Sequence, residues 1–311
     1  MLRSSLLLVT GLLMANPTLA QGLATPAGRE SGPDCRVRLV ASPTGWIIQG
    51  YDPFDSDIPE GTFSVAFTNE GANDCRFVPV FQLDQPPFGL SDGPGKPIRY
   101  ALLNITDSQD VTPRAGRSQR TLSQAEVVLA PRETRTLIFK LVAAPEDVTS
   151  AGTFTENVTI EAQDSNFRIL GGTRLVLGVN VLPSARIGLS GAFTMNNGRA
   201  LVDLGELRPG LAPIPLNLRI SSTGKYEITV TSANAGRLRL GASEWYVPYA
   251  LAIGGSSVNL SGIGTVSSTA KSGRGGGIRQ DSVPIEFTIG DTSGRRAGTY
   301  SDVISVAVTA R

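Results

Sequence analysis

Short runs of alternating apolar and polar residues, each bounded by turn residues, recur along almost the whole sequence, and helical periodicity is nearly absent. The runs cover residues 36–41, 62–68, 76–83, 134–142, 157–162, 173–181, 200–204, 214–220, 226–232, 283–288 and 303–309. The 35 glycines and 20 prolines supply tight turns, and 41% apolar residues are enough for a core rather than a disordered chain. This spacing predicts an all-β sandwich or barrel.

The sequence also contains an internal repeat. Residues 151–160 (AGTFTENVTI) align with 297–306 (AGTYSDVISV), and every aligned pair is identical or similar except Asn157 and Val303. A second match aligns 35–39 (CRVRL) with 185–189 (ARIGL). We therefore predict two copies of one β-domain, at residues 21–182 and 183–311, that meet at Leu182-Pro183-Ser184.

The first twenty residues have the pattern of a secretory signal peptide. Arg3 provides the positive start, residues 6–14 form a short apolar run, and Thr18 and Ala20 are the small residues before cleavage. The apolar run is too short to span a bilayer, and no later stretch is apolar enough to insert. We expect a protein exported through the periplasm, without direct membrane insertion.

Cys35 and Cys75 are the only cysteines, and histidine is absent. In an oxidising compartment the two cysteines are expected to form one disulfide, stabilising the fold by roughly 3–4 kcal/mol, although two free thiols are the alternative.

Without histidine the chain lacks the commonest general base and metal ligand. We expect no enzyme, cofactor or metal; a secreted glycosidase with paired carboxylates is the catalytic alternative. A net charge of +1 argues against nucleic-acid binding.

Several of these motifs together resemble the spore coat protein U domain. They are Cys35, Tyr51-Asp52-Pro53, Cys75, the segment 151–154 before an alternating strand, the closing segment 297–302, and the segments 202–207 and 226–232. The resemblance extends over nearly all of the mature chain through short motifs. The second copy lacks the cysteine pair, a departure from the family pattern.

The resemblance implies two immunoglobulin-like, pilin-like sandwiches in tandem, in a subunit of an archaic chaperone–usher pilus. It also implies that a pilin domain lacks its last strand. A periplasmic chaperone, and then a neighbouring subunit brought by the usher, would supply that strand. The expected location is a fimbria on the cell surface.

The alternating strands at the end of each copy differ in a way that fits this scheme. In the second copy the strand 303–309 is the last before the sequence stops at Arg311, and it would leave an open acceptor edge. In the first copy a further strand, 173–181, follows and is expected to complete the domain from within. The residues on the inward face are Ile304, Val306 and Val308 in the acceptor strand, and Leu175, Leu177, Val179 and Val181 in the self-complementing strand.

Only residues 21–34 lie between the expected signal peptide and Cys35, and the run 27–34 is polar and rich in breakers, so the segment predicts a poor donor strand. A subunit that accepts a strand but cannot donate one belongs at the end of a fibre. The function expected from the sequence is therefore a tip adhesin that binds an unknown surface or receptor. The alternative is a structural subunit of a pilus or surface coat without receptor binding.

A proline-stiffened loop is the candidate adhesive surface. It comprises Pro86, Pro87, Phe88 and Leu90, to which Trp46 and Phe54 could add. The alternative is that these apolar side chains pack into the end of the sandwich.

Three other segments have plainer interpretations. Residues 52–60 lack the spacing of a calcium loop and predict a solvated turn. Residues 271–277 lack the order of a phosphate-binding loop and predict a hairpin tip. The aromatic stretch 243–249 could form a sugar platform, but a strand in the core is the commoner use of such residues.

Overall fold

A computed structural model describes residues 34–55, 57–93, 95–120, 124–268 and 278–311. The expected signal peptide, nearly all of the expected poor donor strand and residues 271–277 lie outside the described residues. The described chain is all-β, as the sequence predicts, and its one short helix is the 3-10 turn η1 (Pro145–Asp147). No helix within these ranges is long and apolar enough to cross a membrane.

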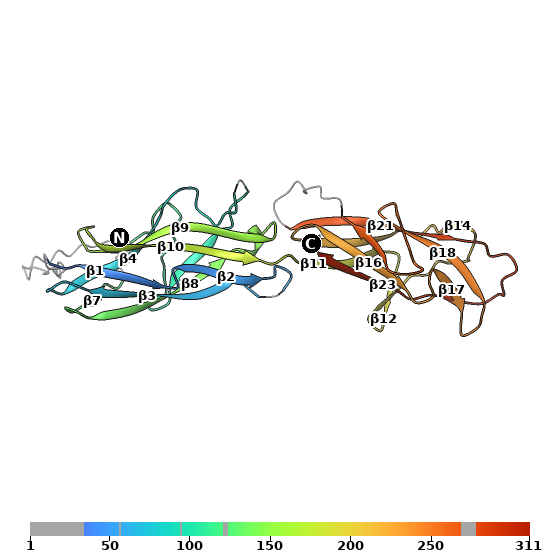
Figure 1. Cartoon of the computed structure of the whole chain (residues 1–311), viewed down its shortest axis with the longest axis horizontal. Coiled ribbons are helices and arrows are strands. Elements are labelled where there is room, and N and C mark those ends of the chain that lie inside the picture. Colours follow the sequence, from blue (N-terminus) through green and yellow to red (C-terminus); the bar gives the residue numbers. More distant parts are fainter. Residues whose placement is uncertain (1–33, 56, 94, 121–123, 269–277) are drawn as a thin grey trace, which may run out of the picture.

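The strands of the first half form two sheets of five strands each (Figure 1). One sheet has the order β1 (Val37–Ser42), β3 (Glu60–Asn69), β8 (Thr134–Ala143), β5 (Tyr100–Asn104) and β6 (Gln109–Asp110). The other has the order β2 (Gly45–Tyr51), β10 (Ile169–Val181), β9 (Gly152–Gln163), β4 (Cys75–Leu83) and β7 (Val127–Leu129). All neighbours are antiparallel except β2 and β10, which are parallel.

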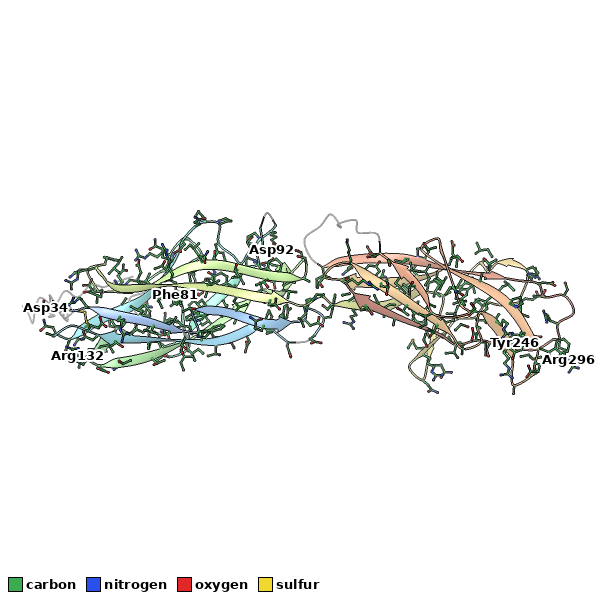
Figure 2. All side chains as sticks on the ribbon, viewed as in Figure 1. Asp34, Phe81, Asp92, Arg132, Tyr246 and Arg296 are labelled. Atoms are coloured by element: carbon green, nitrogen blue, oxygen red, sulfur yellow. A yellow bond between two sulfur atoms is a disulfide. The ribbon has the colours of Figure 1, made fainter. Side chains whose placement is uncertain are left out.

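Alternation along these strands sends every second side chain into a shared core. Along β1, for example, buried and exposed residues strictly alternate. The centre of the core is aromatic: the Trp46 ring stacks on Phe63 at 5.1 Å and on Phe139 at 5.8 Å, and Phe139 meets Phe81 edge-on at 5.2 Å. Phe81 lies in the interior of the first half (Figure 2). Rings packed in this way hold the two sheets together.

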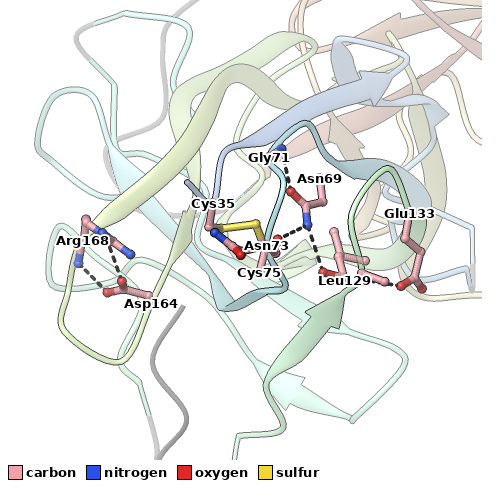
Figure 3. The surroundings of a disulfide bond; sticks show 10 residues. Cys35, Asn69, Gly71, Asn73, Cys75, Leu129, Glu133, Asp164 and Arg168 are labelled. Atoms are coloured by element: carbon pink, nitrogen blue, oxygen red, sulfur yellow. Dashed lines mark hydrogen bonds and ion pairs between the residues drawn. A yellow bond between two sulfur atoms is a disulfide. The ribbon is translucent and has the colours of Figure 1, made fainter. Parts of the chain in front are cut away.

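A disulfide between Cys35 and Cys75 confirms the predicted pairing and excludes two free thiols (Figure 3). The two Cα atoms are 5.3 Å apart, and the sequence separation is 40 residues. Cys35 directly precedes the Arg36 that leads into β1 of one sheet, and Cys75 begins β4 of the other. The bond therefore links the two sheets at one end of the first half.

The second half is built from strands of the same kind. Its largest sheet contains β11 (Ala185–Gly191), β15 (Leu216–Ser222), β21 (Arg279–Ile289), β18 (Tyr246–Ile253), β17 (Arg237–Leu240) and β22 (Tyr300–Ser301) in that order, with β14 (Gly210–Leu211) on β21 and β19 (Ser256–Val258) on β18. A three-stranded sheet has the order β20 (Gly264–Ser267), β16 (Tyr226–Ser232) and β23 (Ile304–Ala310). β12 (Thr194–Asn196) and β13 (Arg199–Leu201) form a separate ribbon.

Two separate hydrophobic cores lie on either side of residues 182–184, one formed by residues 35–181 and the other by residues 185–308. Across this point the Ala151 and Ser184 amides each donate a hydrogen bond of 2.9 Å to Thr223, the first to its carbonyl and the second to its hydroxyl. The division into domains at Leu182-Pro183-Ser184 stays a prediction.

Candidate strand-acceptor site

Two edge strands of the second half lie side by side without pairing. β23 is bonded along its length to β16, from Tyr226 opposite Ala310 to Ser232 opposite Ile304, and β11 is bonded to β15. Within the described residues, no strand pairs with the other edge of β23 or of β11. The two edges belong to different sheets and run next to each other (Figure 1). The outer edges of β23 and β11 therefore present two neighbouring rows of backbone groups that lack a strand partner among the described residues.

The apolar side chains along these two edges are only half-buried. Ile187 and Leu189 of β11, and Ile304, Val306 and Val308 of β23, pack against the second core but keep part of their surface in solvent. Along β23 half-buried and exposed residues alternate, as the sequence predicts for a strand with one apolar face. The two edges thus share a set of half-buried apolar side chains.

In the first half, the strands that correspond to β23 and β11 are β9 and β1, and a further strand, β10, lies beside both. The internal repeat aligns β9 with β23, and β10 runs antiparallel to β9 from Gly152 opposite Val181 onward. Its residues Leu175, Leu177, Val179 and Val181 are all buried in the first core. Where β10 passes β1, a Cβ added at Gly171 would lie only 1.7 Å from the Val37 carbonyl oxygen. β10 therefore fills the space between β9 and β1.

The effect of this extra strand is visible in aligned residues. Val158 and Ile160 of β9 are fully buried, whereas their counterparts Ile304 and Val306 are half-exposed. Likewise Val37 and Leu39 of β1 are buried, whereas Ile187 and Leu189 of β11 are not. The same apolar pattern thus has a neighbouring strand in the first half, and the described residues of the second half provide no equivalent of β10.

A carboxylate fixes the start of β23. Asp302 accepts hydrogen bonds from the Ser232 hydroxyl (2.5 Å), the Tyr249 hydroxyl (2.7 Å), and the amides of Asn234 (3.0 Å) and Val303 (2.8 Å). Burial, and then the Asp302 carboxylate, raise the pKa of Tyr249, so this phenol stays a donor. The network anchors β23 to β16 and β18 and positions its outer edge.

Two of the six candidate adhesive residues lie in the first core, two are half-buried and two are exposed. Trp46 and Leu90 have no exposed surface, so the alternative of packing inside the sandwich is confirmed for these two residues and their assignment to an adhesive patch is wrong. The reason is that alternation on β2 points Trp46 inward, where aromatic packing holds it. Phe88 is half-buried with its ring 4.8 Å from that of Tyr100, Phe54 is half-buried, and Pro86 and Pro87 are exposed.

The two other candidate segments that the structure describes form a turn, at residues 52–60, and part of a strand, at residues 243–249. Asp52 accepts a hydrogen bond from the Phe54 amide at 2.9 Å, which is the geometry of a turn. Val247 and Tyr249 are buried in β18, while Trp245 and Tyr246 are half-buried and carry the guanidinium groups of Arg296 and Arg237 over their rings. Within the described ranges, no group of three or more His, Cys, Asp or Glu residues could hold a metal ion.

Sequence reasoning missed one exposed apolar turn. Phe167, between β9 and β10, is 70% exposed and has a φ of 63°, and Ile169 beside it is 56% exposed. The Asp164 side chain accepts hydrogen bonds from the amides of Asn166 (3.0 Å) and Arg168 (2.8 Å), which makes the turn rigid. The segment Asp164-Ser165-Asn166 could have signalled a turn, but nothing in it signals an outward-pointing phenylalanine.

Comparisons with known proteins give weak structural likenesses. No protein-family model matches the chain, and no curated protein matches it. Among solved structures, it is similar to the complex of a chaperone and a tip adhesion subunit from archaic Csu pili of Acinetobacter baumannii, at 14% identity over 85% of this chain and 97% of that chain, with a TM-score of 0.44. It is also similar to the CupB6 tip adhesin from Pseudomonas aeruginosa, at 10% identity over 88% and 94% of the two chains, with a TM-score of 0.36. Membership of the spore coat protein U family stays a prediction, because no family model matches.

Proposed function

We propose that this chain is a subunit of a chaperone–usher pilus whose second half accepts a β-strand from a partner protein. One observation carries the proposal: apolar residues that β10 buries in the first half have half-exposed counterparts along β11 and β23. An incoming strand would bond to the free edge of β23 and cover these apolar side chains. Strand addition of this kind obtains its affinity from backbone hydrogen bonds and its specificity from alternate side chains.

An open edge beside half-exposed apolar side chains also explains the need for a chaperone. Unpaired strand edges with exposed apolar residues promote aggregation, so a protein made in this form needs a temporary partner strand. In this proposal a periplasmic chaperone supplies the strand first, and a neighbouring subunit brought by the usher then replaces it. The permanent location would be a fimbria on the cell surface.

The first half has a different role in the proposal. Because β10 comes from the same chain and lies in the core, this half needs no strand from outside. A first domain complete in itself, next to an acceptor domain, is suited to the tip of a fibre. There it would act as an adhesin for a surface or receptor, in which Pro86 and Pro87 are the exposed part of the predicted loop.

The experiment compares two substitutions on the same strand. Val306→Asp places a charge on the half-buried apolar side of β23, whereas Ser305→Asp places it on the exposed side. The whole chain and both variants are expressed in the periplasm with and without the cognate chaperone and separated by size-exclusion chromatography. We expect the wild type and Ser305→Asp to be recovered as one-to-one chaperone complexes, and Val306→Asp to lose the complex. A wild-type chain that is a stable monomer without the chaperone, and does not bind it, would rule out the acceptor mechanism.

A further inference from the structure

A hollow of about 320 Å³ lies at the end of the first half that is farther from the second half. Figure 2 labels Asp34 and Arg132 at this end. The hollow is lined by Asp34, Arg36, Glu70, Gly71, Ala72, Pro131 and Arg132. These residues come from three separate segments: the residues before β1, the β3–β4 connection and the β7–β8 turn. The sequence alone does not indicate that these three segments meet.

Arg132 adopts a backbone conformation that normally requires glycine. Its φ is 69°, and it stands third in the turn 130–133, which is closed by a hydrogen bond of 3.0 Å from the Glu133 amide to the Ala130 carbonyl. With proline in second place, such a turn favours glycine or asparagine in third place. A side chain other than these costs about 1–2 kcal/mol there. Strained residues of this kind are concentrated at functional sites.

The β3–β4 connection, which contributes Glu70, Gly71 and Ala72 to the hollow, is held rigidly. The Asn69 side chain donates hydrogen bonds to the carbonyls of Asn73 (2.8 Å) and Leu129 (3.1 Å), and it accepts one from the Gly71 amide (2.8 Å) (Figure 3). Gly71 packs so closely on the Asp34 carbonyl that an added Cβ would lie 1.9 Å from its oxygen. The disulfide at Cys75 lies beside this network (Figure 3). A rigid site of this kind loses little entropy when it binds a ligand.

Two arginines at the hollow have no charged partner among the described residues and can therefore bind an anionic ligand. Glu70 forms an ion pair of 2.9 Å with Arg38, which does not line the hollow. Among the described residues, neither Arg36 nor Arg132 has an ion pair or a side-chain hydrogen bond. Guanidinium groups bind carboxylates in a planar, two-bonded geometry. Asp34 adds a carboxylate of its own, which can accept hydrogen bonds from hydroxyl groups.

We propose that this hollow binds a carboxylate-bearing sugar unit, with Arg36 and Arg132 on the carboxylate and Asp34 on the ring hydroxyls. The volume suits one sugar unit, since pockets for small ligands begin at about 300 Å³. The inference deepens the proposed function and rests on it for the biological role, because it gives the adhesive half a class of receptor. Binding itself needs no fibre assembly.

The test uses the whole chain and three probes: glucuronate, glucose as the matched neutral sugar, and acetate as the bare carboxylate. Binding is measured by saturation-transfer NMR and titration, and stability by thermal unfolding. We expect glucuronate to bind, and glucose and acetate to bind at least about tenfold more weakly, because the loss of a hydrogen bond to a charged group costs about 1.5–3 kcal/mol. Equal binding of glucose or of acetate would overturn the proposal.

The substitution Arg132→Gly removes the guanidinium group from the hollow without straining the turn. Glycine accepts the positive φ, so the variant is expected to keep or raise the unfolding temperature while it weakens glucuronate binding about tenfold. Arg208→Ala, an exposed arginine of the second half, is the matched control and should change neither. Unchanged glucuronate binding in Arg132→Gly, or a lowered unfolding temperature, would overturn the assignment. Val306→Asp should keep glucuronate binding, so failure of the strand-acceptor proposal is distinguishable from failure of this one.

Discussion

The hydroxyl of Tyr100 donates a hydrogen bond of 2.5 Å to Oε2 of Glu156, and it thereby ties β5 of one sheet to β9 of the other. The second half contains the corresponding bond from Tyr249 to Asp302. Glu156 and Asp302 occupy the same place in the internal repeat. In each copy a carboxylate at the same repeat position, within β9 in the first half and just before β23 in the second, thus bonds to a tyrosine of the facing sheet.

Glu156 gives the first prediction. Burial raises the pKa of Glu156 above its ordinary value of 4.5, although the hydrogen bonds from Tyr100 and the Gly89 amide (3.0 Å) oppose this. The folded state therefore holds the proton more tightly than the unfolded state. The contribution of Glu156 to stability should be fully present below pH 4.5 and should be lost as the pH rises through the raised pKa.

Glu156→Gln should remove this dependence, because the amide oxygen still accepts a hydrogen bond and carries no charge into the core. We expect urea unfolding to show a smaller loss of stability between pH 4.5 and pH 7 in the variant than in the wild type. Tyr100→Phe is the companion variant, since it removes the bond and leaves the buried carboxylate. The same pH slope in Glu156→Gln as in the wild type would contradict the prediction.

Asp147 gives a prediction of opposite sign. Burial disfavours its charged form, but hydrogen bonds and ion pairs from Arg99 Nε (2.5 Å) and Lys96 Nζ (2.7 Å) prevail and lower its pKa to about 2. Its contribution is therefore fully present above pH 3.8 and is lost as the pH falls through about 2. Asp147→Asn should cost about 1–2 kcal/mol at pH 7, and the gap to the wild type should close in acid.

The control for this prediction is Glu146→Gln. Glu146 accepts a bond of 2.9 Å from the same Arg99, but both of these side chains are exposed. Exposed ion pairs contribute little, so the substitution should change the free energy of unfolding by less than about 1 kcal/mol. Equal losses in the two variants would show that burial of Asp147 is not the deciding factor.

A third prediction compares one chemical change in both halves. Val158→Ala, in the buried part of β9, should destabilise the first half by roughly 2–3 kcal/mol, because it removes fully buried methyl groups and leaves a cavity. Val306→Ala, on the half-exposed face of β23, should cost only about 1 kcal/mol in the free chain. With a chaperone or a strand peptide bound, its cost should rise towards that of Val158→Ala. A cost for Val306→Ala that is the same with and without the partner would contradict the strand-acceptor assignment.

The fold class can be predicted from the local alternation of apolar and polar residues. The predictions that were wrong concern contacts between residues far apart in the sequence. Alternation on 36–41 and 173–181 correctly predicted β1 and β10, because a period of two needs no knowledge of the partner strand. β2 was not among the predicted strands, since it depends on parallel pairing with β10 far along the chain. For this reason the sequence leaves open whether Trp46 joins the candidate adhesive loop, whereas the structure buries it in the core. The predicted strand 200–204 corresponds only to the short β13, at Arg199–Leu201.

The candidate site shows the same limit. Sequence identified Ile304, Val306 and Val308 as one apolar face, but whether another strand covers that face depends on the arrangement of both sheets. The hollow at Arg132 was beyond prediction, because its three segments meet only in the folded chain. The positive φ of Arg132 leaves no mark in the sequence, since the turn has arginine where glycine would reveal it.

The last prediction concerns the boundary at Leu182-Pro183-Ser184. We insert one specific protease site after Pro183 and, in a second variant, the same site after Ser165, in the turn between β9 and β10. Cleavage after Pro183 should release two folded pieces that separate by size-exclusion chromatography, because each hydrophobic core lies wholly on one side of the cut. Cleavage after Ser165 should leave the pieces together, because β10 remains paired with β9 and β2. The first piece should unfold cooperatively by itself, whereas the second should need a chaperone or a strand peptide to stay soluble. Pieces that stay associated after the cut at Pro183 would indicate one cooperative unit instead of two domains.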